Sequence, residues 1–134
     1  MRKQFVHLTD CDDIEMGVRD EVNGQRVYVT PQGNTYPSIT SILGRQPKPG
    51  IEAWKEKVGY QEANKIMKES AALGTMVHSL CEDYLYNEDL QCEDKEAISV
   101  FNRLRFLMGN IDNIYCIEAP LHSDILKVAG TADC

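Results

Sequence analysis

The chain has 134 residues, of which 43% are hydrophobic and 26% are charged, a balance that is ordinary for one globular domain. No apolar stretch approaches the roughly 18 residues that a membrane-spanning helix requires, and the N-terminus lacks the apolar segment of a signal peptide. We therefore expect a cytoplasmic protein without a membrane partner. The net charge of −7 argues against binding duplex DNA over the whole surface, although it permits local contacts.

The cysteines are scattered along the chain, and no two of them form a Cys-x-x-Cys pair. Such pairs are typical of zinc and iron–sulfur sites. We therefore expect free thiols in a reducing compartment and no iron–sulfur cluster. The cysteines are Cys11, Cys81, Cys92, Cys116 and Cys134.

The first part of the chain has the pattern of strands and turns. A short apolar segment, residues 5–8, precedes an acidic cluster within residues 10–13. Residues 24–30 then alternate between apolar and polar side chains as a strand does. Residues 31–34 have the composition of a turn and lead into residues 35–36, so we expect a β-hairpin here.

Helical patterns follow the predicted hairpin. Residues 37–43 are expected to form a short helix that ends at Gly44, and residues 47–50, which contain two prolines, a connector. Residues 51–58 then have the pattern of a helix around Trp54.

The next helical stretch is predicted to be broken in the middle. Residues 60–73 form one helix in this interpretation, and Gly74 ends it. Thr75 would then cap a further helix over residues 76–86. The apolar face of that helix is expected to consist of Met76, Val77, Leu80, Cys81, Tyr84 and Leu85.

The end of the chain returns to strand patterns. A helix is predicted over residues 93–108, followed by strands over residues 113–119 and 125–129 with a loop at residues 120–124 between them. The order of elements predicts an α+β fold in one domain. Its parts are strands in residues 1–36, a helical block in residues 37–109 and core strands in residues 113–134.

Three side chains suggest chemistry. Asp133 follows the small residues Val128–Ala132, and although an aspartate after a strand is often only a turn residue, small residues on a strand let a ligand approach closely. A carboxylate in such a place can bind a cation. His78 and Glu82 lie one turn apart on the predicted helix, a spacing that also fits a solvated contact.

Four segments together carry a resemblance to a known family. They are Tyr36–Leu43 (YPSITSIL), Trp54 with Gly59 and Ala63, Gly74-Thr75-x-Val77-His78 with Glu82 and Leu85, and Glu118-x-Pro120 with Gly130-Thr131-x-Asp133. In this order and spacing they resemble the RecB-like branch of the PD-(D/E)XK nucleases, above all the phage exonucleases related to the mitochondrial genome maintenance exonuclease. The resemblance spans residues 26–134 and implies a restriction-endonuclease-like core.

The resemblance implies roles for particular residues. His78 and Asp133 would be metal ligands of a catalytic site that uses Mg²⁺ or Mn²⁺. Glu118 and Glu82 match positions near that site and are expected to support it rather than to bind the metal. The family's next strand carries Asp/Glu-x-Lys, and this chain has no such strand. We therefore expect the N-terminal part of a DNA exonuclease, with an incomplete sheet and no activity on its own.

Two further residues match a polar stretch for which the resemblance implies DNA contact. They are Ser38 and Thr40, and the N-capping of a helix explains them equally well.

The implied activity is metal-assisted hydrolysis of phosphodiester bonds in DNA recombination or repair, in the host cytoplasm if a phage encodes the protein. The acidic balance favours single-stranded ends as the partner, because they need fewer phosphate contacts than duplex DNA. Two other interpretations stay open. One is a nuclease-like domain that binds DNA or a protein without cutting, and the other is an α+β interaction module in which His78 and Asp133 are incidental.

Overall fold

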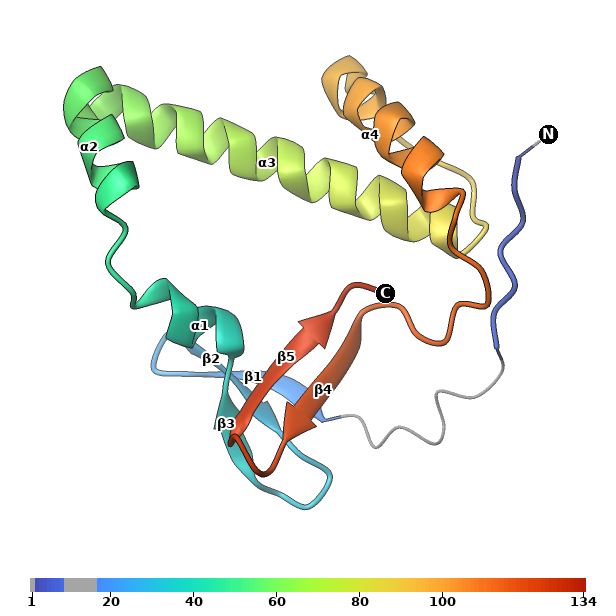
Figure 1. Ribbon diagram of the computed structural model, residues 1–134, viewed down its shortest axis with the longest axis horizontal. Helices are drawn as coiled ribbons and strands as arrows, with labels where there is room; N and C mark the ends of the chain where they lie inside the picture. Colours follow the sequence, from blue (N-terminus) through green and yellow to red (C-terminus); the bar gives the residue numbers. More distant parts are fainter. Residues whose placement is uncertain (1, 9–16) are drawn as a thin grey trace. The chain divides into compact units, whose positions relative to one another are not determined.

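The computed structural model describes residues 2–8 and 17–134, and Figure 1 shows their helices and strands. The chain forms two compact units, each assembled from separate segments of the sequence. The first unit contains residues 2–6 and Lys48–Asn113, and the second contains residues 7–8, 17–47 and Ile114–Cys134. The expected α+β class is confirmed, while the predicted acidic cluster and Cys11 lie outside the described residues.

The long helix of the first unit corrects one prediction. Helix α3, Tyr60–Leu85, is continuous over 26 residues, so the expected break at Gly74 is wrong. The hydroxyl of Thr75 donates to the carbonyl oxygen of Ala71 at 3.0 Å and caps no new helix. A single glycine costs a helix interior only about 1 kcal/mol relative to alanine, and the helix-forming residues around it offset that cost.

Helix α2, Pro49–Val58, begins inside the segment that was expected to be a connector. Pro49 lies in its first turn, where the missing N–H of proline has no partner to lose. Gly59 has a positive φ of 91° and separates α2 from α3. Glycine adopts this conformation without a steric penalty, so the chain can turn between the two helices within one residue.

Helix α4, Lys95–Met108, agrees closely with the predicted helix. Its N-cap is Asp94, whose side chain accepts a hydrogen bond from the N–H of Ala97 at 2.8 Å. Such a cap contributes about 1 kcal/mol. Helix α4 packs against the C-terminal part of α3, as Figure 1 shows.

Aromatic rings join the N-terminal segment to these helices. The ring of Phe5 meets that of Tyr84 edge to face at a centroid distance of 5.1 Å, and Tyr84 meets Phe101 in the same way at 5.6 Å. The side chain of Asn87 accepts a hydrogen bond from the N–H of Phe5 and donates one to its carbonyl. Such contacts explain why residues 2–6 belong to the helical unit. None of the helices in the described part of the chain is long and apolar enough to cross a membrane.

The second unit begins with two antiparallel hairpins that share a strand. Strands β1, Val18–Val22, β2, Gln25–Val29, and β3, Thr35–Pro37, form a sheet in the order β1-β2-β3. The hairpin of β2 and β3 confirms the prediction. Asn23 and Gly24, both with positive φ, form the turn between β1 and β2. Asn-Gly is the preferred pair for a two-residue hairpin turn. The pair therefore indicates a strand before residue 23, which the alternation of side chains alone did not predict.

The last two strands lie later in the chain than predicted. They are β4, Ala119–Ser123, and β5, Val128–Ala132, so the expected strand at residues 113–119 and the expected loop at 120–124 are wrong. Residues 124–127 form the turn, where Lys127 has a positive φ and the Oγ of Ser123 accepts from the N–H of Leu126.

Two features explain why β4 and β5 lie later in the chain than predicted. They are the turn between the two strands and the position of β4 at the edge of its sheet. Ile125 and Leu126 look like strand residues but are 93% and 72% exposed, because the hydrogen bond from the Leu126 N–H holds them in the turn. Pro120 is tolerated within β4 because, among the described residues, β4 pairs with β5 alone.

The core of the second unit is small and lies around β5. Tyr28, Tyr36 and Ala129 are buried against one another, and Ala129 forms a parallel bridge with Ser38. Helix α1, Ile39–Gly44, follows this bridge and confirms the predicted short helix. A Cβ on Gly130 would lie 3.0 Å from the Cγ2 of Ile39. The close approach expected at this glycine is therefore made by α1.

Candidate metal centre

Two carboxylates meet where the β4–β5 hairpin opens. The strand register pairs Ala119 with Ala132, and one further step places Glu118 opposite Asp133. The N–H of Glu118 donates to the carbonyl oxygen of Asp133 at 3.2 Å, which shows that the pairing continues to this point. Directly opposite residues of an antiparallel pair project to the same face, so the two side chains are neighbours.

The two carboxylates are close enough to share a ligand. A carboxylate oxygen of Glu118 and one of Asp133 lie within 4.8 Å of each other. Asp133 is exposed and Glu118 is half-buried. Two like charges at this spacing repel each other, and a divalent cation that accepts oxygen ligands would offset the repulsion. The donor chemistry therefore fits Mg²⁺ or Mn²⁺.

Glu118 has an uncommon backbone conformation. Its φ is 51°, in the left-handed region that a residue with a Cβ enters only at a cost of about 1 kcal/mol or more. A conformation of this kind is maintained by its surroundings, here the start of β4 and the bond to Asp133. Strained residues of this type cluster at functional sites. Glu118 was expected only to support the site, whereas the hairpin register places it directly opposite Asp133.

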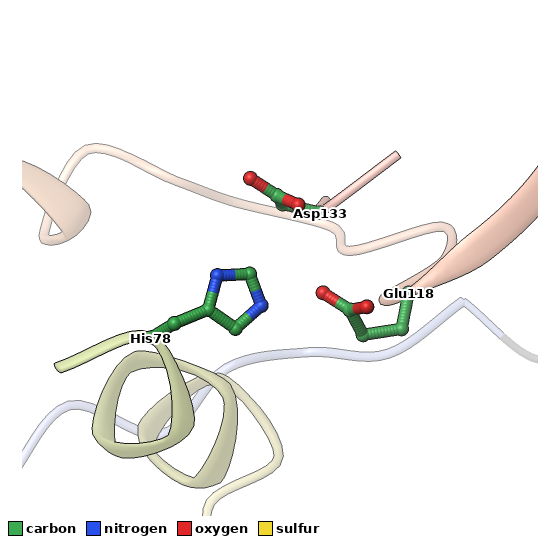
Figure 2. A group of neighbouring side chains, drawn as sticks. All are labelled: His78, Glu118 and Asp133. Carbon is green, nitrogen blue, oxygen red and sulfur yellow. The ribbon is translucent and has the colours of Figure 1, made fainter. Parts of the chain in front are cut away.

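The other two residues that were predicted at or near the metal lie on the first unit. His78 is exposed on α3, and Glu82 lies one turn later on the same helix and is half-buried. Figure 2 shows the side chain of His78 on its helix together with Glu118 and Asp133. The expected approach of His78 to Asp133 would bring together side chains from two different units, and it stays a prediction.

Ser38 and Thr40 form a hydroxyl pair at the start of α1. Their oxygens are 2.7 Å apart, and Ser38 is only 1% exposed. Ser38 occupies the N-cap position as expected, but its side chain makes no capping bond to the backbone, because it bonds to Thr40 instead. Thr40 is the exposed residue of the pair, and contact with DNA here stays a prediction.

A second cluster of polar side chains lies beside the turn that joins β4 to β5. The phenol of Tyr36 donates to Oδ1 of Asp124 at 2.6 Å, and Nε2 of His122 lies 3.7 Å from Oδ2 of the same carboxylate. The hydrogen bond to Asp124 raises the pKa of Tyr36 above its usual range, and burial and the negative charge of Asp124 act in the same direction. These contacts connect β3 to the β4–β5 hairpin. No spacing signal in the sequence connects positions 36 and 124.

The four cysteines that the structure describes, Cys81, Cys92, Cys116 and Cys134, form no disulfide with one another. Burial raises the pKa of the Cys81 thiol, which lowers its thiolate fraction at neutral pH. Cys134 is exposed and directly follows Asp133.

Comparisons with known proteins do not assign the chain to a family. No protein-family model, curated protein or solved structure matches the chain.

Proposed function

We propose that the chain supplies metal ligands of a DNA exonuclease of the RecB-like PD-(D/E)XK type, with Glu118 and Asp133 as the acidic pair. The observation that carries the proposal is the register of the β4–β5 hairpin, which places these carboxylates side by side. The motif resemblance gives the same segment, Gly130-Thr131-x-Asp133, the first acidic ligand.

His78 is the third ligand in this proposal. A neutral imidazole and two carboxylates form a donor set that can hold one divalent ion. Because His78 belongs to the other unit, the proposal requires the two units to dock when the ion binds. Metal binding would then couple to the arrangement of the units, as it often does where ligands come from separate segments.

Each residue would have a distinct task. Asp133 and Glu118 would fix the position of the ion and, through it, of a scissile phosphate. His78 would complete the coordination from α3, and Glu82 would lie beside it at the rim. When bound, Mg²⁺ or Mn²⁺ would neutralise phosphate charge and lower the pKa of an attacking water.

Metal binding tests the acidic pair directly. In a titration followed by Mn²⁺ electron paramagnetic resonance, Asp133→Asn and Glu118→Gln should each weaken binding about tenfold or more, because each removes a charged oxygen ligand. Glu69→Gln is the matched control, since it removes one exposed charge from α3 and no proposed ligand. Equal Mn²⁺ affinities in all variants would exclude the pair as ligands.

The role of His78 can be tested by NMR of the imidazole protons. The chain has three histidines, His7, His78 and His122, whose signals can be compared in one spectrum. Substoichiometric Mn²⁺ should broaden the His78 signal in the native sequence but not in Asp133→Asn. Broadening of the other two histidines with no effect on His78 would remove His78 from the ligand set.

We expect no degradation of labelled single- or double-stranded DNA by these 134 residues with Mg²⁺ or Mn²⁺, because they contain no strand after Asp133 that could carry the family's Asp/Glu-x-Lys motif. Degradation that Asp133→Ala abolishes would show that Glu118 suffices as the second carboxylate. A chain that binds DNA but no metal would instead support the nuclease-like module without catalysis.

A further inference from the structure

A groove in the second unit gathers three arginines. It has a volume of about 810 Å³ and lies between the β1–β2 hairpin and α1. The strand register pairs Arg19 with Tyr28 and Glu21 with Arg26, so Arg19, Glu21 and Arg26 project to one face of the hairpin. Arg45, which directly follows α1, contributes the third guanidinium to the lining.

The arginines of the groove form no ion pair within the described part of the chain. Among the residues that the structure describes, neither Arg19, Arg26 nor Arg45 lies within ion-pair distance of a carboxylate, and Arg45 donates only to the amide oxygen of Gln25 at 3.4 Å. Two lysines elsewhere do form ion pairs, since Lys3 pairs with Asp112 and Lys55 pairs with Glu52.

The local charge is opposite to that of the chain. Three arginines against Asp20 and Glu21 give the groove a net charge of 3 − 2 = +1, whereas the whole chain carries −7. Guanidinium groups collected in one groove repel one another, and an anion that bridges them relieves the repulsion. The planar guanidinium forms paired hydrogen bonds with phosphate, which makes phosphate the favoured anion.

Other features of the lining suit an extended phosphate chain. The side chains of Thr40 and Ser41 add hydroxyl donors on the α1 side. Gly24 and Gly44 belong to the lining, and no atom lies within 4 Å of the position that a Cβ would take at either residue, so a backbone can approach there. Because three cations spread over the groove can contact successive phosphates, a polymer fits better than a single ion.

We propose that this groove binds the phosphodiester backbone of single-stranded DNA. The inference extends the proposed function, because it says where the second unit would hold the substrate strand, and it does not depend on the metal ligands. Sequence preference is not expected, since guanidinium contacts to phosphate carry no base information.

The experiment measures binding in EDTA, so that failure of the metal site cannot affect the result. Fluorescence anisotropy with a labelled oligothymidylate of about 12 nucleotides is compared for the native chain and the variant Arg19→Gln/Arg26→Gln/Arg45→Gln. We expect the triple variant to lose about tenfold or more in affinity, because three charge-assisted contacts are removed. The salt dependence should fall from a slope of about −2 toward zero, since each phosphate contact on a single strand contributes about −0.7.

A matched control distinguishes binding in the groove from a general effect of losing positive charge. The variant Lys65→Gln/Lys68→Gln/Arg103→Gln removes the same number of positive charges from exposed positions of the first unit, and it should bind like the native chain. Circular dichroism confirms that each variant is folded. Equal losses in the two triple variants, or no binding by the native chain, would overturn the proposal.

Two further measurements sharpen the assignment. Glu21→Gln removes the carboxylate opposite Arg26 and should strengthen binding, whereas Arg26→Lys keeps the charge but loses the paired donors and should weaken it. Tripolyphosphate offers adjacent phosphates without a nucleic acid. Displacement of the oligonucleotide by tripolyphosphate at equal phosphate concentration would show a site for small polyphosphates and contradict the assignment to DNA.

Discussion

At the scale of single residues, Glu118 allows stability and function to be separated. Its positive φ suits glycine, so Glu118→Gly should be more stable than Glu118→Ala by about 1 kcal/mol. Both variants should lose Mn²⁺ binding equally, because both lack the carboxylate. Urea denaturation in EDTA measures the difference in stability. Equal stabilities would mean that the left-handed conformation is not maintained in solution.

The phenol of Tyr36 gives a prediction about pH. Its pKa is raised by the hydrogen bond to Asp124, so the neutral phenol stabilises the folded state. This contribution is complete below the unfolded pKa of about 10 and is lost as the pH rises through the folded value. The difference in the free energy of unfolding between the native chain and Tyr36→Phe should therefore shrink above about pH 10. A difference that grows with alkaline pH would contradict the role of the bond.

At the scale of elements, the continuous α3 predicts the effect of one substitution. Gly74 lies in the helix interior, does not have a positive φ, and has no neighbouring atom within 4 Å of the position that a Cβ would take. Gly74→Ala should therefore raise the free energy of unfolding by about 0.5–1 kcal/mol. Thermal melting followed by circular dichroism of the helices measures it. Destabilisation would instead support the helix end that the sequence analysis expected at this glycine.

At the scale of the whole molecule, two separate cores predict local responses to core mutations. Phe101 is 2% exposed in the helical unit and Tyr28 is 2% exposed in the β unit. Phe101→Ala and Tyr28→Ala should each cost about 3–5 kcal/mol in their own unit.

Hydrogen exchange with mass spectrometry shows where that cost is felt. Phe101→Ala should speed exchange in α3 and α4 more than in β2 and β3, and Tyr28→Ala should do the reverse, because each side chain packs within its own unit. Uniform acceleration over the chain by either variant would show that the units unfold as one.

The sequence by itself determined the elements whose signals are local. The hairpin of β2 and β3 follows from alternation and turn composition, and α4 follows from its periodicity. It also determined that Asp133 comes directly after a strand of small residues. These features depend on neighbours within a few positions, so a pattern in the sequence is enough to predict them.

At some positions the sequence pattern fits two different elements, and only the tertiary structure decided between them. Gly74 could end a helix or lie within one, and Ile125 could belong to a strand or to a turn, because the local sequence pattern fits both outcomes in each case. The pairing of Glu118 with Asp133 depends on hairpin register, and a register shifted by one residue would turn every side chain of the strand to the opposite face. The arginine groove likewise exists only once β1, β2 and α1 are folded together, since its residues are far apart along the chain.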